Sequence, residues 1–419
     1  MSGEHGWKIG PAAARYLGPM RALLLLVLIA AVPAAAQTAP RLLPSGPPDT
    51  LAVSLLTMLP GREVYSLFGH SAIRIRSPAR GLDRAYNFGT FDFDQPFFMV
   101  RFARGQLDYI LDTAPFADEL AHYRALGRPM IEQRLALSPA AAEALLRNLD
   151  ENARPENRAY RYDFFFDNCS TRLLDVVARA TAEAGQGRVA LAPATERPTF
   201  RELLYRNTRG APAIALGMNL ALGTPADRVA TAREQTFLPV GLADALDRAT
   251  VGGRPLVASR DTLFWVPGAG TVPQRTEPVV PALAALLGLA WLAAALRPAR
   301  FARWGRAADV ALFGAVGVMG VVFAFLWLGT DHTVTGPNLN LLWAFPGHLG
   351  LAWAARGALS AGWRRYAALA ALGGVMAGVV HLAGIQALPA GALVLAAVVA
   401  LRGGWLALRP APGSRRAVP

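Results

Sequence analysis

Five apolar segments separated by short polar connectors occupy the C-terminal third of the chain, and they constrain its architecture more than any other feature. A helix that spans a membrane needs about 20 consecutive apolar residues. The third of these segments is short, and the last contains Arg402. The pattern predicts a transmembrane domain of about five spans at residues 279–408, with segments at 279–296, 308–329, 341–355, 366–386 and 388–408.

The connectors between these segments differ sharply in charge. Arginines cluster in connectors 297–306 and 356–365 and in the tail 409–419, whereas connectors 330–340 and 387–391 carry no Lys or Arg. Because Arg-rich connectors stay in the cytoplasm, the tail is predicted to be cytoplasmic and residues 37–278 to face the periplasm. Much of the net charge of +13 lies beside these apolar segments, so it indicates topology and no nucleic-acid partner.

The N-terminus has the layout of a cleavable export signal. Lys8, Arg15 and Arg21 precede the short apolar run Ala22–Val32, and small residues follow up to Ala36. This layout predicts cleavage after Ala36 and a protein of the bacterial inner membrane with a periplasmic domain at 37–278. The alternative is an uncleaved anchor, but the apolar run is short for a membrane span.

Residues 37–278 mix short strand and helix patterns, which predicts an α+β domain followed by an all-α transmembrane bundle. Alternation of apolar and polar residues and turn signals place the strands, and capping residues place the helices. Strands are predicted at 51–59, 71–75, 84–89, 106–111, 130–137 and 158–166, and helices at 116–126, 138–152, 169–184, 199–206 and 239–249.

Cys169 is the only cysteine, and it lies in the first turn of the predicted helix 169–184. An unpaired thiol in an exported chain is a liability unless it has a use. The N–H groups and partial positive charge of a helix N-terminus favour thiolate and can bind an oxyanion. Cys169 is therefore a candidate nucleophile with a lowered pKa, and Asn168 is a candidate oxyanion donor. The alternative is an inert buried cysteine.

A thiol nucleophile needs a base, and the predicted soluble domain contains two histidines. His70 lies at the entry to a predicted strand, where its ring can be held firmly. His122 lies in a predicted helix beside charged residues and is interpreted as a surface residue. His70 is therefore the candidate base, with a purely structural histidine as the alternative.

The periplasmic connector 330–340 is also a candidate functional segment. His332, Asn338 and Asn340 are predicted to lie at the membrane surface, at the depth of a lipid head group. Their side chains can donate and accept hydrogen bonds to a substrate there. The alternative is a polar turn in which an Asn caps the next helix.

Several of these segments resemble the Lnb-type bacterial lipoprotein N-acyltransferases. The resemblance rests on residues 69–72, 86–93 and 162–172 in the soluble domain and on the polar connector with the Leu-Leu-Trp that follows it. It implies a permuted papain-like fold in which His precedes Cys, as in lecithin:retinol acyltransferases. NlpC-type peptidases are more distant relatives with the opposite order.

The resemblance also implies an activity. Cys169 would take an acyl chain from a lipid as a thioester, with His70 as base, and pass it to the N-terminal amine of a lipoprotein. Asn87 and Tyr86, on the next strand, are candidates for orienting His70 or contacting the substrate. This chemistry needs no metal or soluble cofactor.

Three points stay open at this stage. The acyl donor is either the lipoprotein itself or a phospholipid, and the oligomeric state is unknown. One rival function is a membrane-tethered peptidase or amidase acting on peptidoglycan, which would use the same Cys–His pair. The other is a lipid- or lipoprotein-binding module without catalysis, in which Cys169 and His70 are structural.

Overall fold

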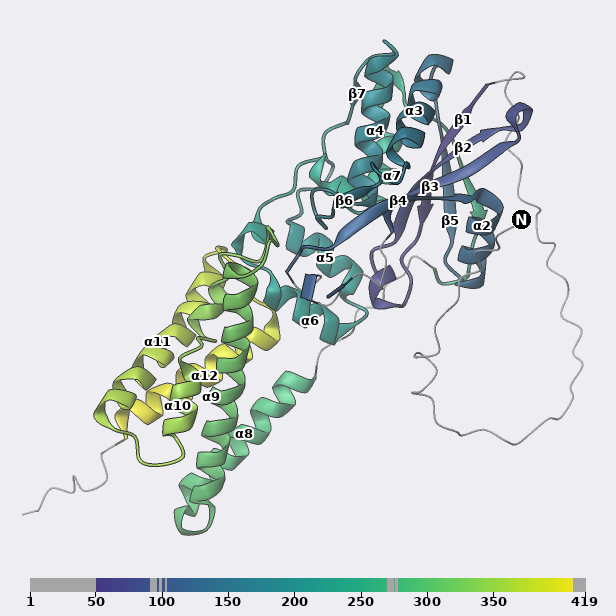
Figure 1. The fold of residues 1–419 in the computed structure, drawn as a ribbon. Helices are drawn as coiled ribbons and strands as arrows, with labels where there is room; N and C mark the ends of the chain where they lie inside the picture. Colours follow the sequence, from purple (N-terminus) through teal and green to yellow (C-terminus); the bar gives the residue numbers. More distant parts are fainter. Residues whose placement is uncertain are drawn as a thin grey trace, which may run out of the picture. The chain divides into compact units, whose positions relative to one another are not determined.

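The fold is described from a computed structural model covering residues 50–90, 96–97, 100–101, 104–269, 275 and 278–409 (Figure 1). The predicted export signal and the tail beyond Arg409 lie outside the described residues. So do residues 91–93, the end of the segment 86–93 that contributes to the family resemblance. The described chain forms an N-terminal α+β domain followed by a C-terminal helical region, as predicted.

A seven-stranded antiparallel sheet forms the centre of the α+β domain. Its strand order is β10-β5-β1-β2-β3-β4-β6. The first five predicted strands are present with shifted ends, whereas β10 was not predicted. The strands are β1 (Ala52–Met58), β2 (His70–Ser77), β3 (Leu82–Thr90), β4 (Asp108–Pro115), β5 (Met130–Leu135), β6 (Ala159–Arg161) and β10 (Val257–Phe264).

The sixth predicted strand, 158–166, is wrong over most of its length. Only β6 pairs with β4, and the chain then forms a turn that is closed by backbone hydrogen bonds between Asp163 and Asp167. The Asp163 side chain accepts hydrogen bonds from the backbone N–H groups of Phe165 and Phe166. These bonds favour a turn at this position instead of a continued strand. The aromatic residues that suggested a strand belong to this turn.

Helices cover both faces of the sheet, which explains why β1 and β2 are buried on both sides. One face packs against α3, α4 and α7, and the other packs against α2. All five predicted helices are confirmed, and α6 is additional. The helices are α2 (Phe116–Ala125), α3 (Pro139–Asn152), α4 (Cys169–Glu183), α5 (Phe200–Thr208), α6 (Pro212–Ala221) and α7 (Pro239–Asp247).

Short elements complete this part of the chain. A small three-stranded sheet has the order β7-β8-β9. The remaining elements are β7 (Val189–Ala190), β8 (Thr250–Val251), β9 (Arg254–Pro255) and the 3-10 turns η2 (Val64–Ser66), η3 (Pro78–Arg80), η4 (Thr224–Asp227) and η5 (Glu234–Phe237).

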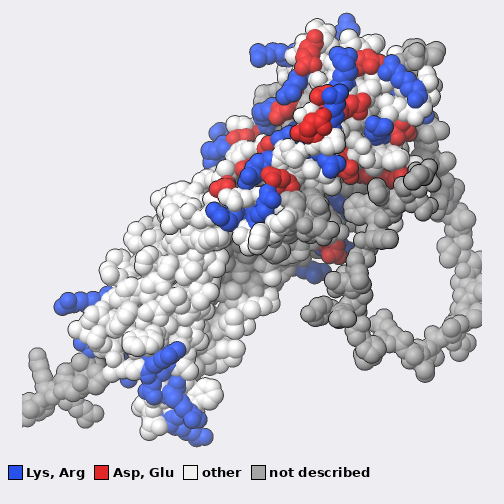
Figure 2. All heavy atoms as spheres, viewed as in Figure 1, with Lys and Arg blue, Asp and Glu red and all other residues white. Residues whose placement is uncertain are grey.

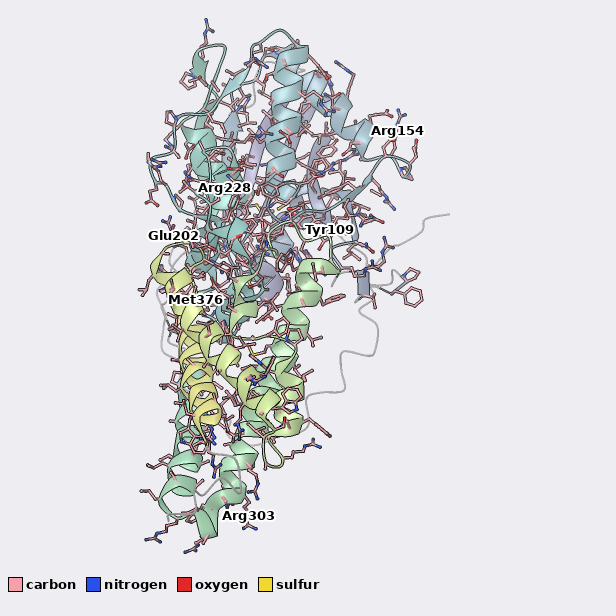
Figure 3. The ribbon with its side chains drawn as sticks, turned by 90° about the vertical axis from the view of Figure 1, so that its left-hand side faces the viewer. Tyr109, Arg154, Glu202, Arg228, Arg303 and Met376 are labelled. Carbon is pink, nitrogen blue, oxygen red and sulfur yellow. The ribbon has the colours of Figure 1, made fainter. Side chains whose placement is uncertain are left out.

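Four helices of the C-terminal region are long and apolar enough to cross a membrane: α8 (Val279–Leu296), α9 (Pro298–Leu328), α11 (Ala361–Leu382) and α12 (Ala390–Leu408). Figure 2 shows almost no charged side chains over the visible face of this region, apart from basic residues near its ends. Within the bundle, Arg303 lies near the turn between α8 and α9, whereas Met376 of α11 lies towards the other end (Figure 3).

A buried ion pair accounts for the arginine that interrupts the last predicted span. The Arg402 guanidinium of α12 donates to both carboxylate oxygens of Asp309 in α9, and both side chains are buried. The Trp291 indole of α8 also donates to Asp309, at 3.0 Å. This cluster joins three helices, and neither of its two charges is left unpaired in the apolar region.

The predicted third span, 341–355, is not a continuous helix. It contains the 3-10 turn η6 (Leu339–Leu342), an irregular stretch and the short helix α10 (His348–Ala354). Pro346 and Gly347 interrupt it, because proline lacks the N–H that a helix interior needs. Within the described residues, four helices are therefore long and apolar enough to cross a membrane, and the third of the five predicted segments is interrupted.

The interrupted segment nevertheless runs through the bundle beside α9 and α11. A Cβ added at Gly320 would meet the Ala344 carbonyl, and one at Gly314 would touch Ala352, so the segment is antiparallel to α9. The His348 ring bonds the Trp343 carbonyl oxygen at 3.1 Å and the Tyr366 hydroxyl at 2.9 Å. Non-helical backbone at membrane depth needs hydrogen-bond partners within the protein, and the His348 ring is one such partner for the Trp343 carbonyl oxygen.

Candidate functional site

The sequence Asn-Cys-Ser-Thr fixes Cys169 as the first residue of α4. Asn168 Oδ1 accepts hydrogen bonds from the backbone of Ser170 at 2.8 Å and Thr171 at 3.0 Å. In return, Thr171 Oγ1 accepts from the Asn168 backbone at 2.8 Å. This reciprocal capping box starts the helix at a defined residue and confirms the predicted helix start.

Asn168 is fully engaged in this structural role. Its Nδ2 donates to the carbonyl oxygens of Phe164, at 2.7 Å, and Phe237, at 2.8 Å. The side chain is only 2% exposed. Both amide hydrogens are therefore in use, and the prediction that Asn168 donates to an oxyanion does not fit the structure.

The start of β2, which carries His70 and Ser71, lies beside the start of α4. Gly69 has a φ of +84°, and a Cβ there would lie 2.7 Å from the Met58 carbonyl oxygen, so a side chain is excluded. Ser71, the residue after His70, contacts the first two residues of α4. Its Oγ lies 3.1 Å from Ser170 Oγ, and its backbone N–H bonds the Cys169 sulfur.

Asn87 on β3 orients the His70 ring. His70 Nε2 lies 3.0 Å from Asn87 Oδ1, and the Asn87 side chain also bonds the Glu119 carboxylate on α2. An ionised carboxylate only accepts, so the Asn87 amide donates to Glu119 and its oxygen accepts from Nε2. His70 Nδ1 is then left as the proton acceptor.

Tyr86 is not part of this arrangement. Adjacent residues of a strand point to opposite faces, so Tyr86 lies on the other side of β3 from Asn87. Its buried hydroxyl donates to Asp150 at 2.7 Å. The prediction that Tyr86 orients His70 or contacts the substrate therefore does not fit the structure. Glu119, which sequence reasoning missed, occupies the position behind Asn87.

Burial determines the charge states of the Cys169 thiol and the His70 ring. Enclosure of the ring lowers the pKa of His70 to about 4, opposed in part by the bond to Asn87 and reinforced by the Arg128 charge. Burial also raises the pKa of the Cys169 thiol, although N–H groups of Ser71, Cys169 and Ser170 oppose this. The predicted lowering of the Cys169 pKa is therefore wrong, because the loss of hydration outweighs the helix N-terminus.

These pKa directions make a testable prediction about the charge states of Cys169 and His70. With the Cys169 pKa raised and the His70 pKa at about 4, both groups are neutral at pH 7. The rate of Cys169 alkylation by iodoacetamide should therefore rise continuously with pH to beyond the ordinary thiol pKa of 9.0. Alkylation measured from pH 5 to pH 10 on the full chain reports this one cysteine. A rate that is already constant at pH 7 would reveal a thiolate–imidazolium pair and contradict the prediction.

Three tyrosines surround the thiol, and sequence reasoning did not single them out. A negative charge on Cys169 would raise the pKa of Tyr123, Tyr160 and Tyr162, so their hydroxyls lie within its electrostatic range. Gly89 also borders the site: its φ is +91°, and an added Cβ would lie 3.4 Å from the Cys169 Cβ. The sequence signal for two of these tyrosines was the alternation of aromatic residues at positions 160 and 162.

The polar connector 330–340 contacts the α+β domain, but its predicted site residues differ in exposure. His332 is exposed and lies against Gly105. Asn338 and Asn340 are fully buried, and both donate to the Leu220 carbonyl oxygen at the end of α6. These two amides therefore hold the connector in place, which contradicts their predicted substrate contact and matches the capping alternative for Asn338.

The same connector reaches the turn that leads into α4. Thr333 Oγ1 donates to Asp163 Oδ2 at 3.1 Å, and Asp163 is the residue that stabilises this turn. The Asp331 backbone N–H donates to the Arg104 carbonyl oxygen, and the Gln106 side-chain amide donates to the Asp331 carboxylate at 3.0 Å. The connector thus links the helical region to the segment preceding Cys169.

Other features of the described chain lie away from the thiol. A cavity of about 650 Å³ is bordered by α5, α6 and the residues that begin α12, including Arg197, Tyr205 and Leu388. Within the described residues, no cluster of three or more His, Cys, Asp or Glu side chains is arranged to hold a metal ion.

Two family models match the chain, one over the α+β domain and the other over the helical region that follows it. The model of the Lnb N-terminal periplasmic domain matches residues 40–206, which include His70, Asn87 and Cys169. The model of the Lnb transmembrane domain matches residues 273–409, which include the polar connector. No curated protein and no solved structure matches the chain.

Proposed function

The chain belongs to the Lnb family and is a membrane protein with a periplasmic part, and from this premise we propose that it is an acyltransferase acting on lipoproteins. It would move an acyl chain from a lipid ester, through a thioester on Cys169, to the N-terminal amine of a lipoprotein. The observation that carries the proposal is the arrangement of Cys169, His70 and Asn87 on the first turn of α4 and the adjacent ends of β2 and β3.

The first half of the reaction forms the thioester. His70 Nδ1 takes the proton of the Cys169 thiol as the sulfur attacks the ester carbonyl, which gives a tetrahedral oxyanion. The C–O bond then breaks, and the leaving alkoxide receives the proton from His70. Because both groups start neutral, proton transfer accompanies attack. Asn87 holds the ring through Nε2 during both transfers.

The second half forms the amide. The neutral N-terminal amine attacks the thioester carbonyl, and its proton passes to His70. The C–S bond breaks, and the thiol of Cys169 is restored with that proton. Exclusion of water from a site in which Cys169 is 9% exposed favours an amine over water as the acceptor.

The proposal includes the predicted topology. Residues 37–278 would form the periplasmic domain after cleavage at Ala36, and residues 279–408 the multi-pass domain in the inner membrane. The interrupted segment 341–355 would be a third crossing without a continuous helix, which keeps the Arg-rich connectors on one side. The tail 409–419 would then be cytoplasmic.

The test uses the purified full chain in phospholipid vesicles with a synthetic diacylglyceryl-Cys lipopeptide. Mass spectrometry should show an N-acylated peptide, either with loss of one ester-linked chain or with lysophospholipid as the by-product. The first result identifies the lipopeptide as donor and the second identifies the phospholipid. Peptide-bond cleavage in peptidoglycan fragments without N-acylation would replace the proposal by the peptidase alternative. Binding without turnover of either substrate would favour the non-enzymatic module.

A further inference from the structure

The tetrahedral intermediate needs hydrogen-bond donors, and the predicted Asn168 side chain does not supply one. Asn168 spends both amide hydrogens on Phe164 and Phe237. The backbone N–H groups of Ser170 and Thr171 are bonded to Asn168 Oδ1. The backbone N–H of Cys169, at the first position of α4, remains as one donor. Because much of the stabilisation in acyl transfer comes from such donors, we expect a side chain to supply a second one.

Tyr160 lies near the N-terminal end of α4, the end that carries Cys169, and several residues contact its ring. It is the central residue of β6, opposite Tyr109 of β4. The Arg172 guanidinium lies 3.6 Å above its ring, and Phe88 packs against the ring edge at 5.9 Å between centroids. Arg172 is three residues after Cys169, so the ring is fixed beside the first turn of the helix that carries the thiol.

A carboxylate fixes Arg172 in this position. The guanidinium donates to both oxygens of Asp167, at 2.6 Å and 2.8 Å. Asp167 immediately precedes the capping residue Asn168, so the ion pair belongs to the same turn as the nucleophile. The cation over the ring also withdraws electron density from the phenol, which makes its O–H a better donor.

The Tyr160 hydroxyl is buried and, within the described part of the chain, has no hydrogen-bond partner. A buried hydroxyl without a partner is costly, and such groups are rare unless a ligand completes them. Burial raises the pKa of Tyr160, and a negative charge on Cys169 would raise it further, so the hydroxyl keeps its proton. It is therefore available as a donor and not as a base.

We propose that the Tyr160 hydroxyl is a catalytic residue that donates a hydrogen bond to the oxyanion formed when Cys169 attacks the acyl carbonyl. This inference rests on the proposed acyl transfer. An oxyanion donor must lie about 3 Å from the developing oxygen and not on the sulfur itself. The Tyr160 hydroxyl lies within electrostatic range of the sulfur and is not bonded to it, so it can bond an oxygen on the attacked carbon. The same donor would serve both tetrahedral intermediates and takes no proton in either step.

The neighbouring tyrosines are less suitable for this role. The Tyr123 side chain is hydrogen-bonded to Arg128. Tyr162 is stacked on Tyr109 with 4.0 Å between ring centroids, and its partly buried side chain borders Gly89. Tyr160 is thus the tyrosine of the three with both a buried unpaired hydroxyl and a charged residue over its ring.

The test is Tyr160→Phe in the full chain, assayed with the diacylglyceryl-Cys lipopeptide in phospholipid vesicles. We expect kcat to fall about 100-fold, because one oxyanion donor is lost. The rate of Cys169 alkylation by iodoacetamide should stay within about twofold of the wild type, since alkylation forms no oxyanion. The melting temperature should not decrease, because the hydroxyl that is removed has no partner.

Tyr86→Phe is the matched control, since it removes a buried hydroxyl of the same domain that is bonded to Asp150 on the other face of β3. It should keep kcat while lowering the melting temperature slightly. Three results would overturn the inference: near-normal kcat in Tyr160→Phe, an equal loss of alkylation, or failure of this variant to fold. Absence of acyl transfer in the wild type, with Cys169 unacylated, would instead refute the proposed function.

Discussion

Cys169→Ser should reduce acyl transfer by more than about 1,000-fold while the protein remains folded. The two side chains are similar in size, so the serine fits beside Gly89, where space is limited. A serine hydroxyl is much harder to ionise than the thiol, and the burial that raises the Cys169 pKa would disfavour an alkoxide further. N-acylation of the diacylglyceryl lipopeptide, followed by mass spectrometry, measures the loss.

His70→Ala should cost a comparable factor, and the double variant should cost little more, because the nucleophile and its base act as one unit. His122→Ala is the matched control. It replaces the other histidine of residues 37–278, which is exposed on α2, and should leave activity unchanged. Near-normal acyl transfer by Cys169→Ser, or strictly multiplicative losses in the double variant, would show that the thioester mechanism is wrong.

Local signals were sufficient to predict most of the secondary structure. The Ser138-Pro139 start of α3 is confirmed, with Ser138 Oγ accepting from the Ala141 backbone. The Asn168 start of α4 is likewise confirmed, because a capping box is encoded within four residues. Strand 158–166 failed since its aromatic composition resembles a strand, whereas the Asp163 side chain closes a turn.

Long-range packing explains what sequence patterns missed in the helical region. Hydropathy identified the segment 341–355 but not its interruption, because the partners that satisfy its irregular backbone are distant. Gly320 and Gly373 provide the space for close approach, and Tyr366 provides a hydrogen bond. A polar side chain on another helix is not visible in a window of apolar residues.

The residues of the candidate site also fall into two groups, those that local sequence identifies and those that depend on packing. Cys169 and His70 were identifiable from residue type and local position, and Asn87 was one of two candidates on the next strand. The choice between Asn87 and Tyr86 depends on which face of β3 points towards His70, and this is settled by the register with β2 and β4. Glu119 and Tyr160 act through contacts between separate elements. The pKa of Cys169 was predicted in the wrong direction because burial, unlike helix position, is a property of the whole fold.

Replacing residues 279–408 by an unrelated membrane anchor should lower acyl transfer by about 100-fold or more, because correct placement of the reacting groups is lost. The connector 330–340 bonds the α+β domain at three places: the start of β4, the Asp163 turn and the end of α6. Without these contacts the turn that precedes Cys169 loses one of its supports. Activity with the lipopeptide measures the effect, and Cys169 alkylation shows whether the α+β domain stays folded.

Point variants separate support by the connector from direct contact with the substrate. The double change Asn338→Ala and Asn340→Ala leaves the Leu220 carbonyl and the Trp343 indole unpaired, at a cost of about 1–3 kcal/mol for each buried group. It should lower both the melting temperature and the activity. His332→Ala removes an exposed ring and should leave the melting temperature unchanged, so any loss of activity it causes reports substrate contact. Full activity with the unrelated anchor would show that the bundle only tethers the protein, whereas full activity of the Asn double variant alone would restrict the essential support to Asp331 and Thr333.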